Sequence, residues 1–82
     1  MAHRGQVALT QMRAGQSGVV AHVMGGRGAA SRLAALGVRP GKRIRKVSAM
    51  AMRGPVTIEV DRTQVAIGYG MAAKIAVQPI EP

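Results

Sequence analysis

Short apolar segments, separated by glycine and proline, run through most of the chain. Val56, Ile58 and Val60 alternate with polar residues, which is the period-two pattern of a strand with one buried face. Four other segments are equally short and rich in Val, Ile and Ala: residues 17–24, 43–49, 65–69 and 75–77. About five short strands of this kind predict a mainly β fold, a small and partly open barrel.

Residues 29–36 predict the one clear helix of the chain. Ala29, Leu33 and Leu36 fall on a single stripe at helical spacing. We therefore expect the strands to curl around Leu33 and Leu36. The glycine-rich segment before this helix, residues 25–28, predicts a flexible turn or loop.

The residues after this helix predict how the chain turns. Gly37 suits the left-handed position that follows a helix, with Val38 placed for the accompanying apolar contact. Pro40 and Gly41 have the order that a type II turn requires. Residues 61–64 predict a tight hairpin connection between strands at 56–60 and 65–69.

Two single helical turns are predicted outside this helix. Leu9 and Met12 have the three-residue spacing of one turn, which Gly15 ends, and residues 71–74 predict another. The uneven pattern of residues 43–49 predicts a β-bulge. The expected folded domain is therefore 9–77, between a mobile segment at 1–8 and a tail at 78–82.

Composition limits the class of protein. The chain has 82 residues, enough for one domain, and no cysteine, which excludes disulfides and thiolate metal sites. It also has no apolar stretch of about 18 residues. Its start is charged and polar, which argues against a signal peptide and predicts a cytoplasmic location.

The net charge favours an anionic partner, with a solvated basic surface that keeps the protein soluble as the alternative. Twelve Lys and Arg against three acidic residues give a formal net charge of +9. Five of these cations lie within eight residues: Arg39, Lys42, Arg43, Arg45 and Lys46. Tyr69 is the only aromatic residue, so the chain offers bases almost no aromatic side chains on which to stack. Nucleic acid is therefore a disfavoured partner.

Neither metal binding nor catalysis is predicted from the residues. His3 and His22 lie far apart, and neither has ligand spacing to a carboxylate. Glu59 and Asp61 would form at best a weak oxygen site. No serine has a local base partner. We therefore predict no catalytic residue, no cofactor and no metal ligand.

A set of spaced residues across the chain resembles the FeoA family. The residues are Leu9, Met12 and Gly15, then Val19, then Arg32, Leu33, Leu36, Gly37, Pro40 and Gly41, then Gly54 and Pro55, and last Ala73 to Val77. The block from Arg32 to Gly41 is the most specific part. Lys46 departs from the family pattern, which usually has an apolar strand residue there, and Arg53 with Gly54 departs from a common Gly-Asp or Gly-Gly pair.

This resemblance implies an SH3-like barrel that acts as a non-catalytic accessory of bacterial ferrous-iron uptake. Its implied partner is the cytosolic region of FeoB, a membrane permease with a GTPase domain, beside which anionic lipid head groups could add to the attraction. Met50 and Met52 lie in a connection, where flexible methionines suit a docking surface, although packing in the core is an equal alternative. The candidate partner-binding residues are Met50 and Met52 together with the cations of the nearby basic face: Arg53, Lys42, Arg43 and Arg45. The sequence leaves two alternatives open, a basic nucleic-acid-binding module and a domain that senses transition-metal ions.

Overall fold

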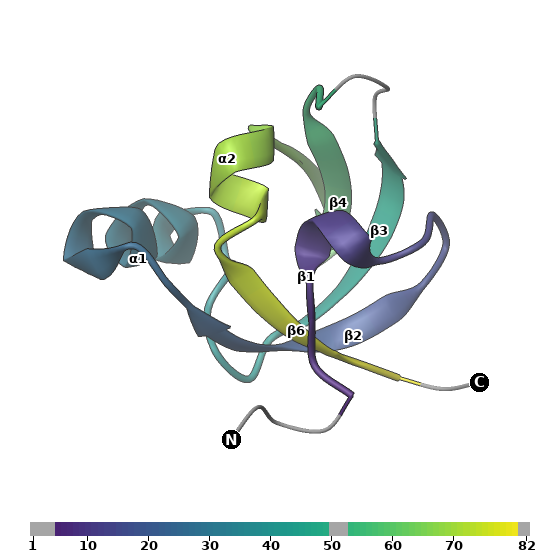
Figure 1. Ribbon diagram of the computed structural model, residues 1–82, viewed down its shortest axis with the longest axis horizontal. Helices are drawn as coiled ribbons and strands as arrows, with labels where there is room; N and C mark the ends of the chain where they lie inside the picture. The colour runs from purple at the N-terminus through teal and green to yellow at the C-terminus, as the bar shows by residue number, and fades with distance from the viewer. Residues whose placement is uncertain (1–4, 50–52, 81–82) are drawn as a thin grey trace.

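A computed structural model describes residues 5–49 and 53–80 of the chain. The helices and strands in chain order are β1 (Val7–Ala8), the 3₁₀ turn η1 (Leu9–Gln11), β2 (Ser17–Val23), α1 (Gly26–Ala35), β3 (Arg43–Ala49), β4 (Val56–Val60), β5 (Thr63–Ile67), α2 (Tyr69–Ala72) and β6 (Ile75–Pro79). The strands form one antiparallel sheet in the order β1-β6-β2-β3-β4-β5. The sheet curls around the core, and α1 lies at one side of it (Figure 1). The predicted mainly β fold is confirmed.

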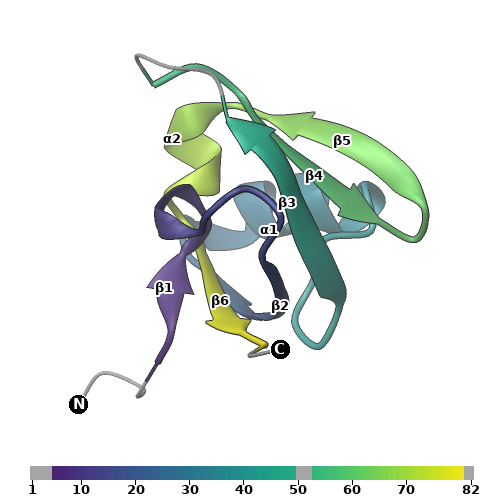
Figure 2. The same cartoon turned by 90° about the vertical axis from the view of Figure 1, so that its right-hand side faces the viewer.

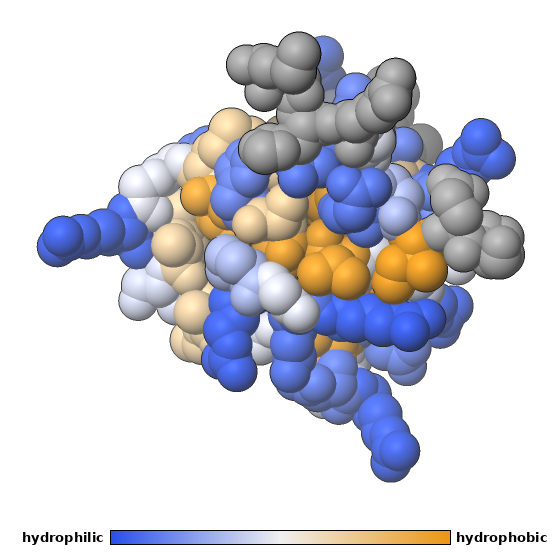
Figure 3. Space-filling view, turned by 90° about the horizontal axis from the view of Figure 1, so that it is seen from below, coloured by the Kyte–Doolittle hydropathy of each residue, from blue (hydrophilic) through white to orange (hydrophobic). Residues whose placement is uncertain are grey.

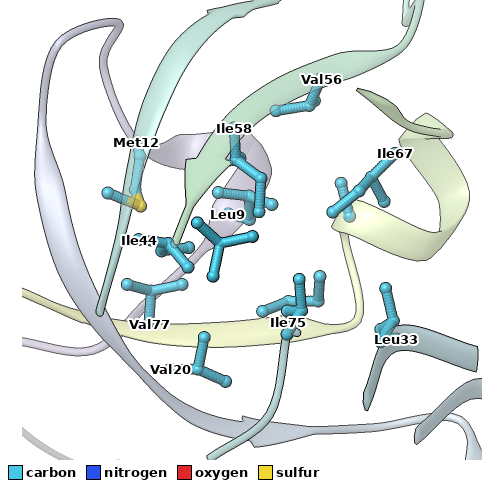
Figure 4. Packing of buried hydrophobic residues seen from close by; sticks show 13 residues of the cluster. Leu9, Met12, Val20, Leu33, Ile44, Val56, Ile58, Ile67, Ile75 and Val77 are labelled. Carbon is cyan, nitrogen blue, oxygen red and sulfur yellow. The ribbon is translucent and has the colours of Figure 1, made fainter. Parts of the chain in front are cut away.

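The hydrophobic core lies inside the curl of the sheet and receives side chains from most elements (Figure 4). Val56, Ile58 and Val60 of β4 are all buried, as their alternation predicts. The expected turn at Leu9 and Met12 is present as η1 and its C-cap, and both side chains are buried against the strands. In these two segments, the side chains that the sequence spacing predicts to be buried are the ones that lie in the core.

The prediction that both Leu33 and Leu36 enter the core is half wrong. Leu33 is buried, but Leu36 is 49% exposed. The helix ends at Ala35, and Leu36 is its C-cap, with a φ of −91° and a ψ of 2° outside the helical region. Because the backbone leaves the helix here, the 3.6-residue spacing no longer places Leu36 on the buried stripe.

The start of α1 is also earlier than predicted. Gly26, Arg27 and Gly28 form its first turn, where a flexible loop was expected. Gly25 is the N-cap, and its φ of +100° is one that favours glycine. The glycines therefore allow the chain to turn directly from β2 into the helix. The need for this turn outweighs the low helix propensity of glycine.

The turns after α1 follow the sequence prediction. The Val38 amide donates to the Leu33 carbonyl at 2.8 Å, the Gly37 amide donates to that of Ala34 at 2.9 Å, and Gly37 has a φ of +89°. This is the Schellman arrangement. Gly41 also has a φ of +89°, and the Lys42 amide donates to the Arg39 carbonyl at 3.0 Å. The chain therefore reverses into β3 where Pro40 and Gly41 predict it.

The β4–β5 hairpin is tighter than predicted. Its turn is the pair Asp61 and Arg62, with φ values of 52° and 65°, and Val60 pairs with Thr63. Positive φ at both central residues is the type I′ geometry of two-residue hairpins. β5 therefore begins at Thr63 and ends at Ile67, and Tyr69 opens α2 instead of continuing the strand.

The sheet also extends beyond the expected limits of 9–77. Val7 pairs with Val77, and Ala8 pairs with Ala76. β6 continues to Pro79 and lies between β1 and β2. The predicted bulge in β3 is confirmed, because the register shifts between Lys46 and Ser48.

Candidate functional site

The surface over the starts of β2 and β3 is hollowed and lined by cations. One hollow of about 480 Å³ is lined by residues 13–17 together with Arg43 and Ile80. A second, of about 310 Å³, reaches the β4–β5 turn, and its lining includes Arg45 and Arg62 together with Glu59 and Asp61. Both hollows share Ser17 and Arg43. We call the combined surface the arginine groove and define it by Arg13, Arg43, Arg45 and Arg62.

Pairing between strands that are distant in sequence builds this groove. Ser17 of β2 pairs with Arg45, and Val19 pairs with Arg43. The Ile80 amide donates to the Ser17 carbonyl at 2.9 Å, which brings the residue after β6 alongside the start of β2. Sequence reasoning missed Arg13 and Arg62 as candidates, because only this tertiary pairing brings their segments together.

Ion pairs take up some of the cations near the groove. Lys42 Nζ lies 2.8 Å from Asp61 Oδ2, and Arg45 Nη2 lies 3.3 Å from Glu59 Oε1. These two carboxylates are the only ones among residues 5–49 and 53–80. Arg13, Arg43 and Arg62 are exposed. The groove therefore has a local excess of positive charge even after both carboxylates are paired.

Lys46 does not belong to this charged surface, contrary to the prediction of a five-cation cluster. Its side chain is buried on the inner side of β3. Its Nζ donates to the carbonyl oxygens of Leu9 at 3.2 Å, Thr10 at 3.3 Å and Met12 at 2.6 Å. The ammonium thus binds two carbonyls of η1 and that of its C-cap, and burial lowers the pKa of Lys46 below its ordinary value.

The described candidates for partner binding occupy two separate places. Lys42, Arg43 and Arg45 lie at the start of β3, while Arg53 follows the far end of that strand. The Arg53 guanidinium lies 5.9 Å from the centroid of the Tyr69 ring, a cation–π distance. Met50 and Met52, which were predicted to dock a partner, lie outside the described residues.

Partly buried apolar side chains lie in and beside the groove. Seen from below, hydrophobic side chains gather in the middle of the molecule, and hydrophilic ones surround them (Figure 3). Ile80 in the groove is half-buried, as is Val19, which shares a face of β2 with Ser17. Apolar surface rimmed by charge is typical of protein interaction sites.

Histidines and carboxylates do not gather in the described structure. Among residues 5–49 and 53–80, no three of them could hold a metal ion together. His22 is exposed on β2, while Glu59 and Asp61 are held by Arg45 and Lys42. In the same part of the chain, no helix is long and apolar enough to cross a bilayer.

Comparison with known proteins decides the family. The FeoA domain model matches residues 7–79. A crystal structure of an iron uptake regulatory protein (FeoA) is 33% identical, covers 92% of this chain and 97% of its own, and superimposes with a TM-score of 0.83. The chain belongs to the FeoA family. An accessory role in iron uptake and the SH3-like fold follow from this membership.

Other structures share the fold at lower identity. The solution structure of FeoA from Chlorobium tepidum is 19% identical over 92% of this chain and 71% of its own, with a TM-score of 0.83. A manganese-dependent transcriptional repressor is 21% identical over 98% of this chain but only 45% of its own, with a TM-score of 0.86. No curated protein matches the chain. The FeoA barrel therefore also occurs as one part of longer repressor proteins.

Proposed function

We propose that this FeoA-family chain is a non-catalytic accessory that binds the cytosolic region of the FeoB GTPase-permease and modulates its assembly or activity. The arginine groove is its docking surface. Binding would hold the chain at the inner face of the membrane, where anionic head groups add a second attraction. The observation that carries the proposal is the exposed pair Arg13 and Arg43 in one hollow, while the two described carboxylates, which line the other hollow, are paired with Lys42 and Arg45.

The chemistry of the groove favours an acidic protein segment as its occupant. Arginine recognises carboxylates with paired donors, and Ile80 offers an apolar contact within the same hollow. Complementary charge also speeds association and makes it sensitive to salt. A protein partner with acidic and apolar side chains fits both features of the surface.

Binding of the purified cytosolic region of FeoB tests the proposal. We expect the double variant Arg13→Glu and Arg43→Glu to bind at least about tenfold more weakly, because two attractive charges become repulsive. The matched control is Arg27→Glu and Arg32→Glu, which makes the same charge change on exposed positions of α1, at the far side of the molecule (Figure 1). The control is expected to lose only the small, salt-screened part of the affinity.

Calorimetry at low and at moderate salt separates these effects. Equal losses in the two double variants would mean that net charge, and not the groove, governs binding. An absence of binding by the unmodified chain at both salt concentrations would contradict the proposal. The GTPase rate of the FeoB region, with and without the chain, reports whether docking modulates activity.

A further inference from the structure

β5 forms a free edge of the sheet. It is the last strand in the order and pairs only with β4, and no described element lies beyond it (Figure 2). The opposite edge, β1, has two residues, whereas β5 has five. The residues of β5 include no charge and no proline: Thr63, Gln64, Val65, Ala66 and Ile67. Natural edge strands usually have such features to prevent pairing with another chain.

The register of the hairpin identifies the groups on the open side. In a two-residue hairpin, the residues flanking the turn, Val60 and Thr63, exchange hydrogen bonds. Alternation then directs the backbone N–H and C=O of Gln64 and Ala66 away from β4. Among the described residues, no other hydrogen bond involves these groups. Both residues are exposed, so an added strand could make up to four backbone hydrogen bonds here.

Charge indicates what kind of strand fits this edge. Arg62 directly precedes β5. At the other end of the strand, Arg53 lies against Tyr69, which follows the last residue of β5 by two positions. A second copy of this chain would bring another formal charge of +9, whereas an acidic segment would meet a cation at each end of the strand. Five residues of strand span about 17 Å, so acidic side chains six residues apart would reach both ends.

We propose that β5 accepts an extended acidic segment of a partner protein as a further strand of the sheet. Backbone hydrogen bonds to Gln64 and Ala66 supply the pairing, and Arg62 and Arg53 select for acidic ends. Val65 is half-buried and packs against the core, so the residue opposite it is apolar. This surface shares Arg62 with the arginine groove but includes none of Arg13, Arg43 and Arg45, and the proposal does not depend on FeoB being the partner.

A pair of synthetic peptides tests the charge selection. The acidic peptide EVTVTVE, capped at both ends, places Val opposite Val65 and Glu beyond each end of β5, and KVTVTVK is its basic counterpart. We expect the acidic peptide to shift the amide resonances of Gln64 and Ala66. It should bind about three- to tenfold more tightly than the basic peptide at low salt, with the difference falling as salt rises.

A proline substitution tests the backbone pairing. Ala66→Pro removes a donor that faces away from β4, so the hairpin is retained, and we expect a loss of at least about tenfold in peptide affinity. Ala66→Ser keeps the donor and is expected to bind as the unmodified chain does. Methylation of alternate amide nitrogens in the peptide gives the same test without altering the protein, because only one of the two sets faces β5.

Three outcomes would overturn the inference. One is unchanged binding by Ala66→Pro and by both methylated peptides. Another is a set of resonance shifts centred on Arg13 and Arg43, which would place the peptide in the arginine groove. The third is a concentration-dependent dimer in sedimentation that Ala66→Pro abolishes, which would make a second copy the occupant of the edge.

Discussion

Strand β3 contributes cations to two regions, the arginine groove on the outside and the barrel interior beneath η1. The cations have different surroundings in the two regions. Lys46 points inward from β3, and three backbone carbonyls surround its ammonium. Arg43 and Arg45 lie on the outer side, where Arg43 is exposed and Arg45 pairs with Glu59. Successive side chains of a strand point to opposite faces. A run of like charges along a strand therefore need not form one charged surface.

The largest effect on stability is expected inside the barrel. Leu33→Ala should lower the free energy of unfolding by about 2–5 kcal/mol, because it removes a buried side chain and leaves a cavity. Leu36→Ala, three residues away at an exposed position, should change it by no more than about 0.5 kcal/mol. Urea denaturation of both variants measures the contrast. Similar losses in the two would show that Leu36 is also packed.

Removal of the inner cation is expected to cost somewhat less. Lys46→Ala should lower the free energy of unfolding by about 2–4 kcal/mol, because three carbonyls lose their donor and space opens beneath η1. Lys46→Met fills that space and relieves the burial of a charge, so its loss should be smaller. Denaturation measures both, with Arg43→Ala as the control on the outer face of the same strand. A larger loss in Arg43→Ala would reverse the roles that the structure assigns to these residues.

The pH dependence of stability gives a further test of Lys46. Its pKa in the folded chain is lowered by burial, so it lies below the ordinary lysine value of about 10.4. Between these two pKa values the unfolded chain binds more protons, and the free energy of unfolding therefore rises with pH in that window. Denaturation from pH 7 to 10.5 should show this increment in the unmodified chain and not in Lys46→Met. Parallel curves would contradict the lowered pKa.

The smallest effect on stability is expected at the rim of the groove. Asp61→Asn removes the ion pair with Lys42 but tolerates the positive φ of the turn. The free energy of unfolding should fall by no more than about 1 kcal/mol. Affinity for the cytosolic region of FeoB should rise, because the groove gains positive charge. Denaturation and calorimetry on the same variant check both, and a fall in affinity at low salt would oppose the proposed site.

Sequence patterns predicted the segments in which local chemistry is decisive. The alternation of Val56, Ile58 and Val60 identified β4 and its buried face. The order of Gly37, Pro40 and Gly41 identified two turns whose φ values only a few residues adopt readily. The two-residue strand β1 was missed, because so short a segment has no period to read.

The candidate site was only partly predictable. Arg43 and Arg45 were identified from the run of cations, and both line the groove. Arg13 and Arg62 were missed, and Lys46 was assigned to the surface although it is buried. These assignments depend on which segments pair and on which way each side chain points. The spacing of charged residues along the chain predicts neither of these.

The sequence by itself determined the mainly β class, the turns, the net charge and the family resemblance, because each depends on residue type and local spacing. The tertiary structure alone decided that Lys46 is buried, that Leu36 is exposed and that four arginines line one groove. The physical reason is that burial and proximity arise from contacts between distant segments. Strand register fixes those contacts, and a shift of one residue would direct each side chain of a strand to the opposite face.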